Sequence, residues 1–282
     1  MTLPPFDLHR PSSVEEAREL LTRYGEDAAV ICGGTELLLL LKLGFAAYGH
    51  LVDIKGIAAL GGIRSEGGTL VIGSTMTHRQ IERSPVVLER LPTLATMERQ
   101  VANIRVRSVG TLGGNLCFSD PHSDPATFLL ALDAEVEVEG TRSSLADFLV
   151  GPYETALAPG QLLGAVRVPV PPAGTRIVHR KLAFHERPAA TVTCVSYVAD
   201  GVLEESRIAV GSVGARAVRA VEAERSLAGV AVGDASALSL AATLAADASQ
   251  PTEDANGSVD YKANLVRVLV NRCLADALAN GD

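Results

Sequence analysis

Two short stretches of this chain carry residues that could bind a charged ligand. Residues 32–37 read CGGTEL and residues 111–115 read TLGGN, so each stretch combines two glycines with hydroxyl or amide side chains. Consecutive glycines permit positive φ and let another group approach the main chain closely. Successive exposed N–H groups in such a turn form a concave site for an anion. Both stretches therefore favour phosphate binding, and the alternative is two ordinary tight turns.

The first stretch is expected between a strand and a helix. Residues 28–31 predict a short buried strand, and the five leucines at 37–41 predict a buried helix that Gly44 ends. Residues 51–54 predict a second strand, which completes a β-turn-α-β unit. Unpaired N–H groups at the start of a helix attract phosphate, so this order of elements suits a phosphate ligand.

The second stretch lies between an alternating segment and an apolar helix. Residues 104–107 alternate apolar and basic side chains, and residues 126–132 predict the helix. Between them, residues 119–124 read SDPHSD, but catalytic triads are assembled in space and not from adjacent residues. Asx turns and a helix cap explain Asp120 and Asp124. Asp124 could instead reach a ribose hydroxyl of a ligand held by the second stretch.

The composition and the missing motifs narrow the function. The 282 residues carry a net charge of −8, no Trp and 4% aromatic residues, which argues against nucleic-acid binding. The chain contains no GxGxxG, P-loop, GxSxG or HExxH motif, so a Rossmann site and a classical NTPase are disfavoured. We therefore expect a protein that holds a cofactor and leaves the chemistry to that cofactor.

The four cysteines are spread along the chain, and none lies in a CxxC pair, which disfavours a zinc or iron–sulfur site. They are Cys32, Cys117, Cys194 and Cys273. We expect them to be reduced and to pack as small apolar residues, which indicates a cytoplasmic chain. The N-terminus does not read as a secretory signal, and Lys42 interrupts the leucine run before it could span a bilayer.

The rest of the chain predicts two groups of elements separated by a proline-rich point at residues 169–174. Before that point, the patterns predict a hairpin at 64–73, helical segments at 78–84 and 85–100, and strands at 135–139 and 162–168. After it, they predict a small antiparallel sheet with helices: strands 176–183, 191–199 and 207–213, helices 218–228 and 236–246, and a last helix after Ser258. His78 and His122 are expected to be surface or cap residues.

Both glycine stretches also carry a resemblance to a known family. Parts of the first resemble the first flavin motif of the xanthine dehydrogenase family: GGTELL at 33–38, KLG at 42–44 and HLVDI at 50–54. RSVGTLGGN at 107–115, with Asp120 and Asp124 after it, resembles the second flavin motif. The resemblance covers nearly the whole chain and is strongest to the separate FAD-binding (medium) subunit of carbon monoxide dehydrogenase-type molybdenum hydroxylases.

The resemblance implies an α+β fold. It predicts a p-cresol methylhydroxylase-type FAD-binding domain made of two α/β subdomains, residues 1–57 and 58–173, with the cofactor between them. A small C-terminal α+β domain of the CO dehydrogenase flavoprotein type, an antiparallel sheet plus helices, would follow at residues 174–282.

The resemblance also implies which residues contact FAD. Two opposite groups would meet the pyrophosphate: Gly33, Gly34 and Thr35, and Thr111, Gly114 and Asn115. Asp124 would bond the adenosine ribose, Leu163 would pack near the ring system, and Lys181 would approach the flavin. Further residues would line the site: Ile31, Cys32, Glu36, Leu37, Val101, Ala102 and Gly110. Cys32 stands where Ala is usual in the family, one small residue for another. No catalytic residue and no metal ligand is expected in this chain.

By the same resemblance, the chain is expected to relay electrons within a heterotrimer, alone or dimerised. A molybdopterin-binding large subunit would oxidise the substrate, and a small subunit with [2Fe–2S] clusters would pass electrons to FAD in this chain. FAD would then reduce an acceptor such as a quinone, NAD or oxygen. The alternative is a stand-alone flavin-dependent oxidoreductase of the same domain type that acts on its own small substrate. For that reaction Lys181, His185 and Arg187 are the candidate residues beside the ring.

Overall fold

The computed structural model describes residues 2–184 and 187–278. The chain divides into two compact units, of which the first comprises Met1–Phe118, Glu135–Phe148 and Glu154–Val168. The second unit comprises Ser119–Ala134, Leu149–Tyr153 and Pro169–Asp282.

A three-stranded parallel sheet opens the first unit, in the order β1–β3–β2. Its strands are β1 (Asp7–His9), β2 (Ala28–Ile31) and β3 (His50–Asp53). Helix α1 (Val14–Tyr24) precedes β2, and α2 (Leu37–Leu43) follows it and ends at Gly44. Gly44 has a φ of 76°, the left-handed conformation that glycine adopts readily after a helix. The predicted β-turn-α-β unit is therefore confirmed.

The burial of α2 differs from the prediction of a buried helix. Within α2, Leu41 is buried, whereas Leu39 and Leu43 are 47% and 45% exposed. The leucines continue around the helix, but a short helix in a β-α-β unit packs along one side only. The outer leucines therefore stay exposed despite their apolar character.

A five-stranded sheet forms the rest of the first unit, in the order β4–β5–β10–β6–β7. Its strands are β4 (Ile63–Glu66), β5 (Thr69–Gly73), β6 (Glu135–Val138), β7 (Thr141–Ser144) and β10 (Leu163–Pro169). Six helices accompany it among the described residues: α3 (His78–Glu82), α4 (Pro85–Arg90), α5 (Pro92–Glu98), α6 (Ile104–Val109), α7 (Leu112–Phe118) and α9 (Leu145–Phe148). The short strand β9 (Glu154–Thr155) completes the unit.

Two segments of this region fold differently from their sequence patterns. Residues 104–107 alternate as a strand does, yet they form α6, because the Asn103 side chain accepts hydrogen bonds from the N–H groups of Arg105 and Val106. The single helical segment predicted at 85–100 is divided into α4 and α5. Pro92 begins the second helix, since proline fits the first turn of a helix and disfavours a helical residue before it.

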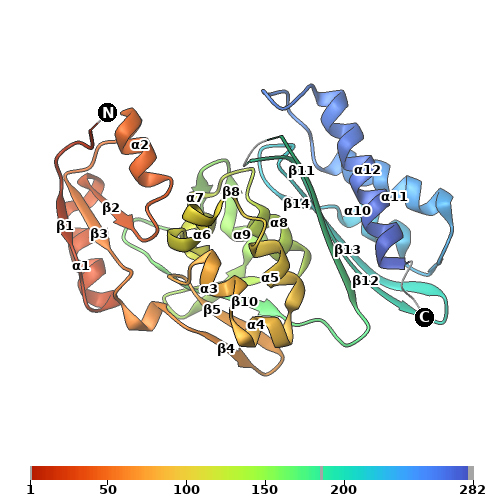
Figure 1. Ribbon diagram of the computed structural model, residues 1–282, viewed down its shortest axis with the longest axis horizontal. Coiled ribbons are helices and arrows are strands. Elements are labelled where there is room, and N and C mark those ends of the chain that lie inside the picture. The colour runs from red at the N-terminus through yellow and green to blue at the C-terminus, as the bar shows by residue number, and fades with distance from the viewer. Residues whose placement is uncertain (1, 185–186, 279–282) are drawn as a thin grey trace. The chain divides into compact units, whose positions relative to one another are not determined.

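The second unit is built on an antiparallel sheet in the order β11–β12–β13–β14, with β15 also paired to β13. The strands of this sheet are β11 (Arg176–Ala183), β12 (Pro188–Ala199), β13 (Val202–Gly211), β14 (Val218–Arg219) and β15 (Val230–Ala231). The second unit also contains β8 (Leu149–Gly151), which is not part of this sheet. The helices are α8 (Asp124–Ala131), α10 (Val221–Leu227), α11 (Ala235–Ala248) and α12 (Val259–Leu278). Figure 1 shows α10, α11 and α12 along one face of this sheet.

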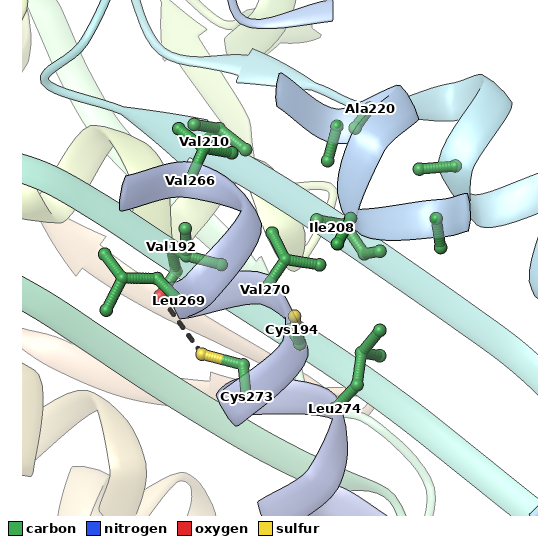
Figure 2. Close-up of a cluster of buried hydrophobic side chains, with 14 of the residues drawn as sticks. Val192, Cys194, Ile208, Val210, Ala220, Val266, Leu269, Val270, Cys273 and Leu274 are labelled. Carbon is green, nitrogen blue, oxygen red and sulfur yellow. Dashed lines mark hydrogen bonds between the residues drawn. The ribbon is translucent and has the colours of Figure 1, made fainter. Parts of the chain in front are cut away.

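The core of the second unit lies between these helices and the sheet. Figure 2 shows side chains of α12 against those of β12 and β13, and the Cys273 Sγ lies 4.0 Å from the carbonyl oxygen of Val192. The apolar positions predicted for the last helix are all buried: Val266, Leu269, Val270, Cys273, Leu274 and Ala277. Among the described residues, no helix combines the length and the apolar character that crossing a membrane requires.

Candidate functional site

The two glycine loops, residues 32–36 and 109–115, meet inside the first unit. A Cβ added to Gly33 would lie 2.5 Å from the Val109 carbonyl oxygen and 2.7 Å from the Gly110 Cα. Real Cβ atoms do not approach backbone so closely, so only glycine at position 33 lets the loops touch. The Cys32 thiol also hydrogen-bonds the Thr111 side chain, which ties the same loops together.

The first loop offers free donors. Gly34 adopts a φ of 70°, and Leu38 N–H donates to its carbonyl at the start of α2. Within the described chain, the backbone N–H groups of Gly33, Gly34 and Thr35 have no protein acceptor. Three successive free N–H groups beside a left-handed glycine form a nest for an anion. The first loop therefore fits a phosphate of the expected cofactor.

The second loop is the first turn of helix α7 and not a glycine turn, which corrects the sequence interpretation. Neither Gly113 nor Gly114 has positive φ. The Leu112 N–H donates to the Met76 carbonyl and the Gly113 N–H to that of Ser74, each at 3.0 Å. The Gly114 N–H donates to the Thr111 hydroxyl at 3.1 Å. These three donors are therefore used within the protein, and the second loop is not a nest of the same kind.

The two glycines of the second loop have different surroundings. A Cβ on Gly113 would lie 2.6 Å from the carbonyl oxygen of Ser74, so this glycine is needed for the protein's own packing. A Cβ on Gly114 would meet only the Thr111 Oγ1, at 2.9 Å, within 4 Å. Among the described residues, no backbone atom outside helix α7 lies within 4 Å of that Cβ position. A cofactor phosphate that approaches the main chain closely would fit there.

His78 supports the second loop from behind, and its prediction as a surface or cap residue is wrong. Its backbone N–H donates to the Gly110 carbonyl at 3.0 Å. Its Nδ1 lies 2.6 Å from the Glu98 Oε2, and the two side chains are 3% and 0% exposed. Packing of α3, α5 and α6 around this pair buries it, and nothing in the local sequence marks that burial.

The other predicted contacts of the first unit lie near these loops in the sequence. Ile31 ends β2, and Glu36 and Leu37 begin α2. Gly110 is buried at the end of α6, and Asn115 lies inside α7. Further along the chain, Leu163 begins β10 and is 4% exposed.

Asp124 and Lys181, predicted to contact separate parts of the cofactor, are bonded to each other in the second unit. The Lys181 ammonium donates to the Asp124 Oδ2 at 2.6 Å. The Thr191 hydroxyl donates to the other carboxylate oxygen at 3.2 Å and lies 3.0 Å from the Ser212 hydroxyl. Sequence reasoning missed Thr191 and Ser212, although Thr191 is the cross-strand partner of Lys181. A buried carboxylate with charged and hydroxyl partners is held in one orientation.

The histidine next to this group is kept neutral. Burial, with a contribution from the Lys181 charge, lowers the pKa of His179 to about 3. Its Nδ1 lies 2.8 Å from the Thr193 hydroxyl. Of the other candidates, Arg187 pairs with Asp120 at 3.2 Å, and His185 lies outside the described residues.

The cysteines beside the glycine loops are protonated thiols at neutral pH. Burial raises the pKa of Cys117 to about 12, and it also raises that of Cys32. A thiol that stays protonated is a poor nucleophile. Their positions favour the packing interpretation over redox chemistry.

Comparisons with known proteins cover both units. A family model described as "FAD binding domain in molybdopterin dehydrogenase" matches residues 4–171, and one described as "CO dehydrogenase flavoprotein C-terminal domain" matches residues 180–277. The carbon monoxide dehydrogenase medium chain of Afipia carboxidovorans is 35% identical over 280 residues, with 97% of each chain covered. The medium chain from Hydrogenophaga pseudoflava is 36% identical over 285 residues, with 99% of each chain covered.

A solved structure has the same fold as this chain. It is the carbon monoxide dehydrogenase from Hydrogenophaga pseudoflava that lacks the Mo-pyranopterin moiety of the molybdenum cofactor. Its matching chain has a TM-score of 0.95 at 36% identity, with 99% of both chains covered.

Proposed function

Because the chain belongs to the family of FAD-binding domains of molybdopterin dehydrogenases, we propose that it is the FAD-binding medium subunit of a heteromeric molybdenum hydroxylase. The observation that carries this proposal is the meeting of the two glycine loops, with free N–H groups on one side and an open space at Gly114 on the other. Bound FAD would supply the redox chemistry, taking electrons from one partner and delivering them to an acceptor.

The residues of the chain would bind and orient the cofactor. Gly33, Gly34 and Thr35 would donate their backbone N–H groups to the diphosphate. Gly114 would let the diphosphate approach α7, with Thr111 and Asn115 beside it. Further contacts with the cofactor are proposed on the resemblance alone: Ile31, Cys32, Glu36, Leu37, Val101, Ala102, Gly110, Asp124, Leu163 and Lys181.

The partners of the chain follow from the kind of subunit it resembles. The relatives are named as medium chains, and the name of the solved relative refers to a molybdenum cofactor, so both support a complex of several chains that contains such a cofactor. We propose that the partners are a molybdopterin-binding large subunit and a [2Fe–2S] small subunit, which together with this chain form a heterotrimer. These names do not favour the stand-alone flavin enzyme considered from the sequence. Four free cysteines support a cytoplasmic location.

The proposed domain division is residues 1–57, 58–173 and 174–282. The three main sheets support it, because each falls within one of these ranges: β1–β3, β4–β7 with β10, and β11–β15. Helix α8 lies within the second of these ranges in the sequence but packs in the compact unit of the C-terminal sheet. A separate sheet with its own hydrophobic layer is what a domain or subdomain requires.

The test is to isolate the chain with its companions and determine what it binds. We expect a tagged full-length chain to co-purify with two other subunits and to carry one FAD, measured by its visible absorption and by release of FAD on denaturation. After removal of FAD, added FAD should restore the flavin absorption of the complex. A colourless chain without companions that takes up no FAD would contradict the proposal.

A further inference from the structure

The turn before α6 holds a residue in a strained conformation. Ala102 has a φ of 39°, a left-handed conformation that is unfavourable for an L-residue with a side chain. Such a conformation persists only when the surrounding structure holds it. Val101, the preceding residue, is buried at 7% exposure, so the turn is anchored on one side by packing.

Arg107 is the side chain that holds this turn. Its Nη1 donates to the Val101 carbonyl at 2.9 Å and to the Ala102 carbonyl at 3.4 Å. Its side chain is only 13% exposed. The guanidinium places its Nη1 on the two carbonyls while its Nε faces the Glu82 carboxylate, and a lysine has only one nitrogen to offer to both sides.

Glu82 restrains Arg107 from the other side. The Arg107 Nε lies 3.6 Å from the Glu82 Oε2, and Glu82 is 7% exposed. Arg79 donates to both oxygens of the same carboxylate, at 3.0 and 3.1 Å, and Arg99 lies 3.6 Å from one of them. Since Arg79 fixes the carboxylate, the carboxylate attracts Arg107 in a fixed direction.

Helix α6 links this clamp to the glycine loops. The clamped turn leads into α6, and Val109 at its last position presents the carbonyl oxygen that faces Gly33. The His78 N–H, from the helix that also carries Glu82, bonds the Gly110 carbonyl after α6. Helix α3 therefore restrains α6 at both ends, through Glu82 at its entry and through His78 at its exit.

We infer that Arg107 is a positioning residue for the cofactor site. It bonds the carbonyls of a strained turn, and the turn fixes the position of α6. The position of α6 in turn sets Val109 and Gly110 against Gly33. Arg107 therefore determines how well the two glycine loops fit FAD, without touching FAD itself. This inference rests on the proposed function, because its effect is on the affinity for FAD.

The test compares variants in the full-length chain, within its complex, by the dissociation constant of FAD. Arg107→Gln and Arg107→Lys should each raise that constant at least tenfold, because neither replacement can hold the two carbonyls and the Glu82 carboxylate at the same time. Arg99→Gln is the matched control, since Arg99 contacts the same carboxylate but no carbonyl of the turn, and it should change the constant less than twofold.

A rescue distinguishes positioning from general stability. Glycine adopts positive φ without strain, so adding Ala102→Gly to Arg107→Gln should recover most of the lost affinity for FAD. Ala102→Gly alone gives the reference affinity against which the double variant is compared. If Arg107→Gln fails to fold, the same rescue is measured in the Arg107→Lys background.

Two results would overturn the inference. One is an unchanged dissociation constant in both Arg107 variants, and the other is a loss of affinity that Ala102→Gly does not repair. In either case the unaltered chain would still bind FAD, and the proposed function would stand. An unaltered chain that binds no FAD would instead overturn the proposed function.

Discussion

In the first glycine loop, the N–H groups of residues 33–35 have no acceptor among the described residues, and Gly34 has positive φ. In the second loop, the N–H groups of residues 112–114 are bonded to the protein, and neither glycine has positive φ. Both loops contain Gly-Gly with a threonine within two positions of the pair. The same residue types thus provide donors in one loop and closely packed backbone in the other.

This difference shows that a glycine pair serves two separate physical needs. Positive φ and free N–H groups bind an anion, as in the first loop. The absence of a side chain lets two segments of backbone approach, as at Gly33 beside Val109 and at Gly113 beside Ser74. Among the described residues, the Gly114 Cβ position meets only the Thr111 Oγ1 and no backbone atom outside helix α7 within 4 Å, which leaves room for a ligand to approach the main chain there.

The largest expected effect is at Gly33, where a single methyl group should separate the loops. In Gly33→Ala, the added carbon would lie 2.5 Å from the Val109 carbonyl oxygen. Overpacking of this kind costs about 1–3 kcal/mol, so the dissociation constant of FAD should rise roughly tenfold to a hundredfold. The measurement is FAD titration of the FAD-free complex. The control is Gly56→Ala, where the methyl group meets no atom of the described residues within 4 Å. An equal rise in the dissociation constant there would contradict a steric clash as the cause of the effect at Gly33.

The next prediction separates a ligand role from a packing role within the second loop. Gly114→Val should lower FAD content at least several-fold, and it should lower the melting temperature of the FAD-free complex less than Gly113→Ala does, because its Cβ meets the Thr111 Oγ1 but no backbone atom of the described residues outside helix α7 within 4 Å. Gly113→Ala should lower both, since its methyl group would strike the Ser74 backbone at a cost of about 1–3 kcal/mol. Equal FAD content in Gly114→Val and the unaltered chain would contradict the proposal that FAD lies against Gly114.

A smaller effect on FAD is expected from the pair behind the second loop. His78→Leu leaves the fully buried Glu98 carboxylate without its partner, which should cost about 1–3 kcal/mol of stability by urea unfolding. The affinity for FAD should fall only a few-fold, because the free donors of the first loop are untouched. Glu98→Gln keeps a hydrogen-bonding group and should cost less. A greater loss of FAD affinity in His78→Leu than in Gly33→Ala would contradict the expectation that the first loop contributes more to FAD binding than the second.

The smallest effect is expected at the cysteines. Cys32→Ala removes one hydrogen bond to Thr111 and should change the dissociation constant of FAD less than about threefold. In the native chain both Cys32 and Cys117 should resist a thiol reagent at pH 8, because burial raises the pKa of each thiol. The pKa of Cys117 is raised to about 12. Rapid labelling of Cys117 in the native complex, at the rate seen in urea, would contradict this.

The pKa of Cys117 also predicts a pH effect on stability. Its folded pKa of about 12 lies above the unfolded value of 9.0. The unfolded chain therefore loses this proton first, and stability should be complete below pH 9 and fall as the pH rises toward 12. In Cys117→Ala the decline above pH 9 should be shallower by urea unfolding.

Family membership, the α+β fold class and FAD as cofactor were predicted from the sequence, and the comparisons confirm them. Local signals were enough for several elements, such as the end of α2 at Gly44 and the buried positions of α12. Other features depend on contacts between distant segments. The buried pair of His78 and Glu98 is an example, because 20 residues separate its members in the sequence. The individual FAD contacts remain predictions.

The sequence by itself determined where glycine, capping residues and apolar periods occur, because those depend on the backbone and on neighbours within a few positions. It thereby determined the two loops and most elements around them. Only the tertiary structure decided which N–H groups stay free, that the leucines of α2 are partly exposed, and that Arg107 bonds the turn at Ala102. The physical reason is that burial and hydrogen-bond satisfaction depend on which segments meet in space, and the local pattern of residues does not specify that.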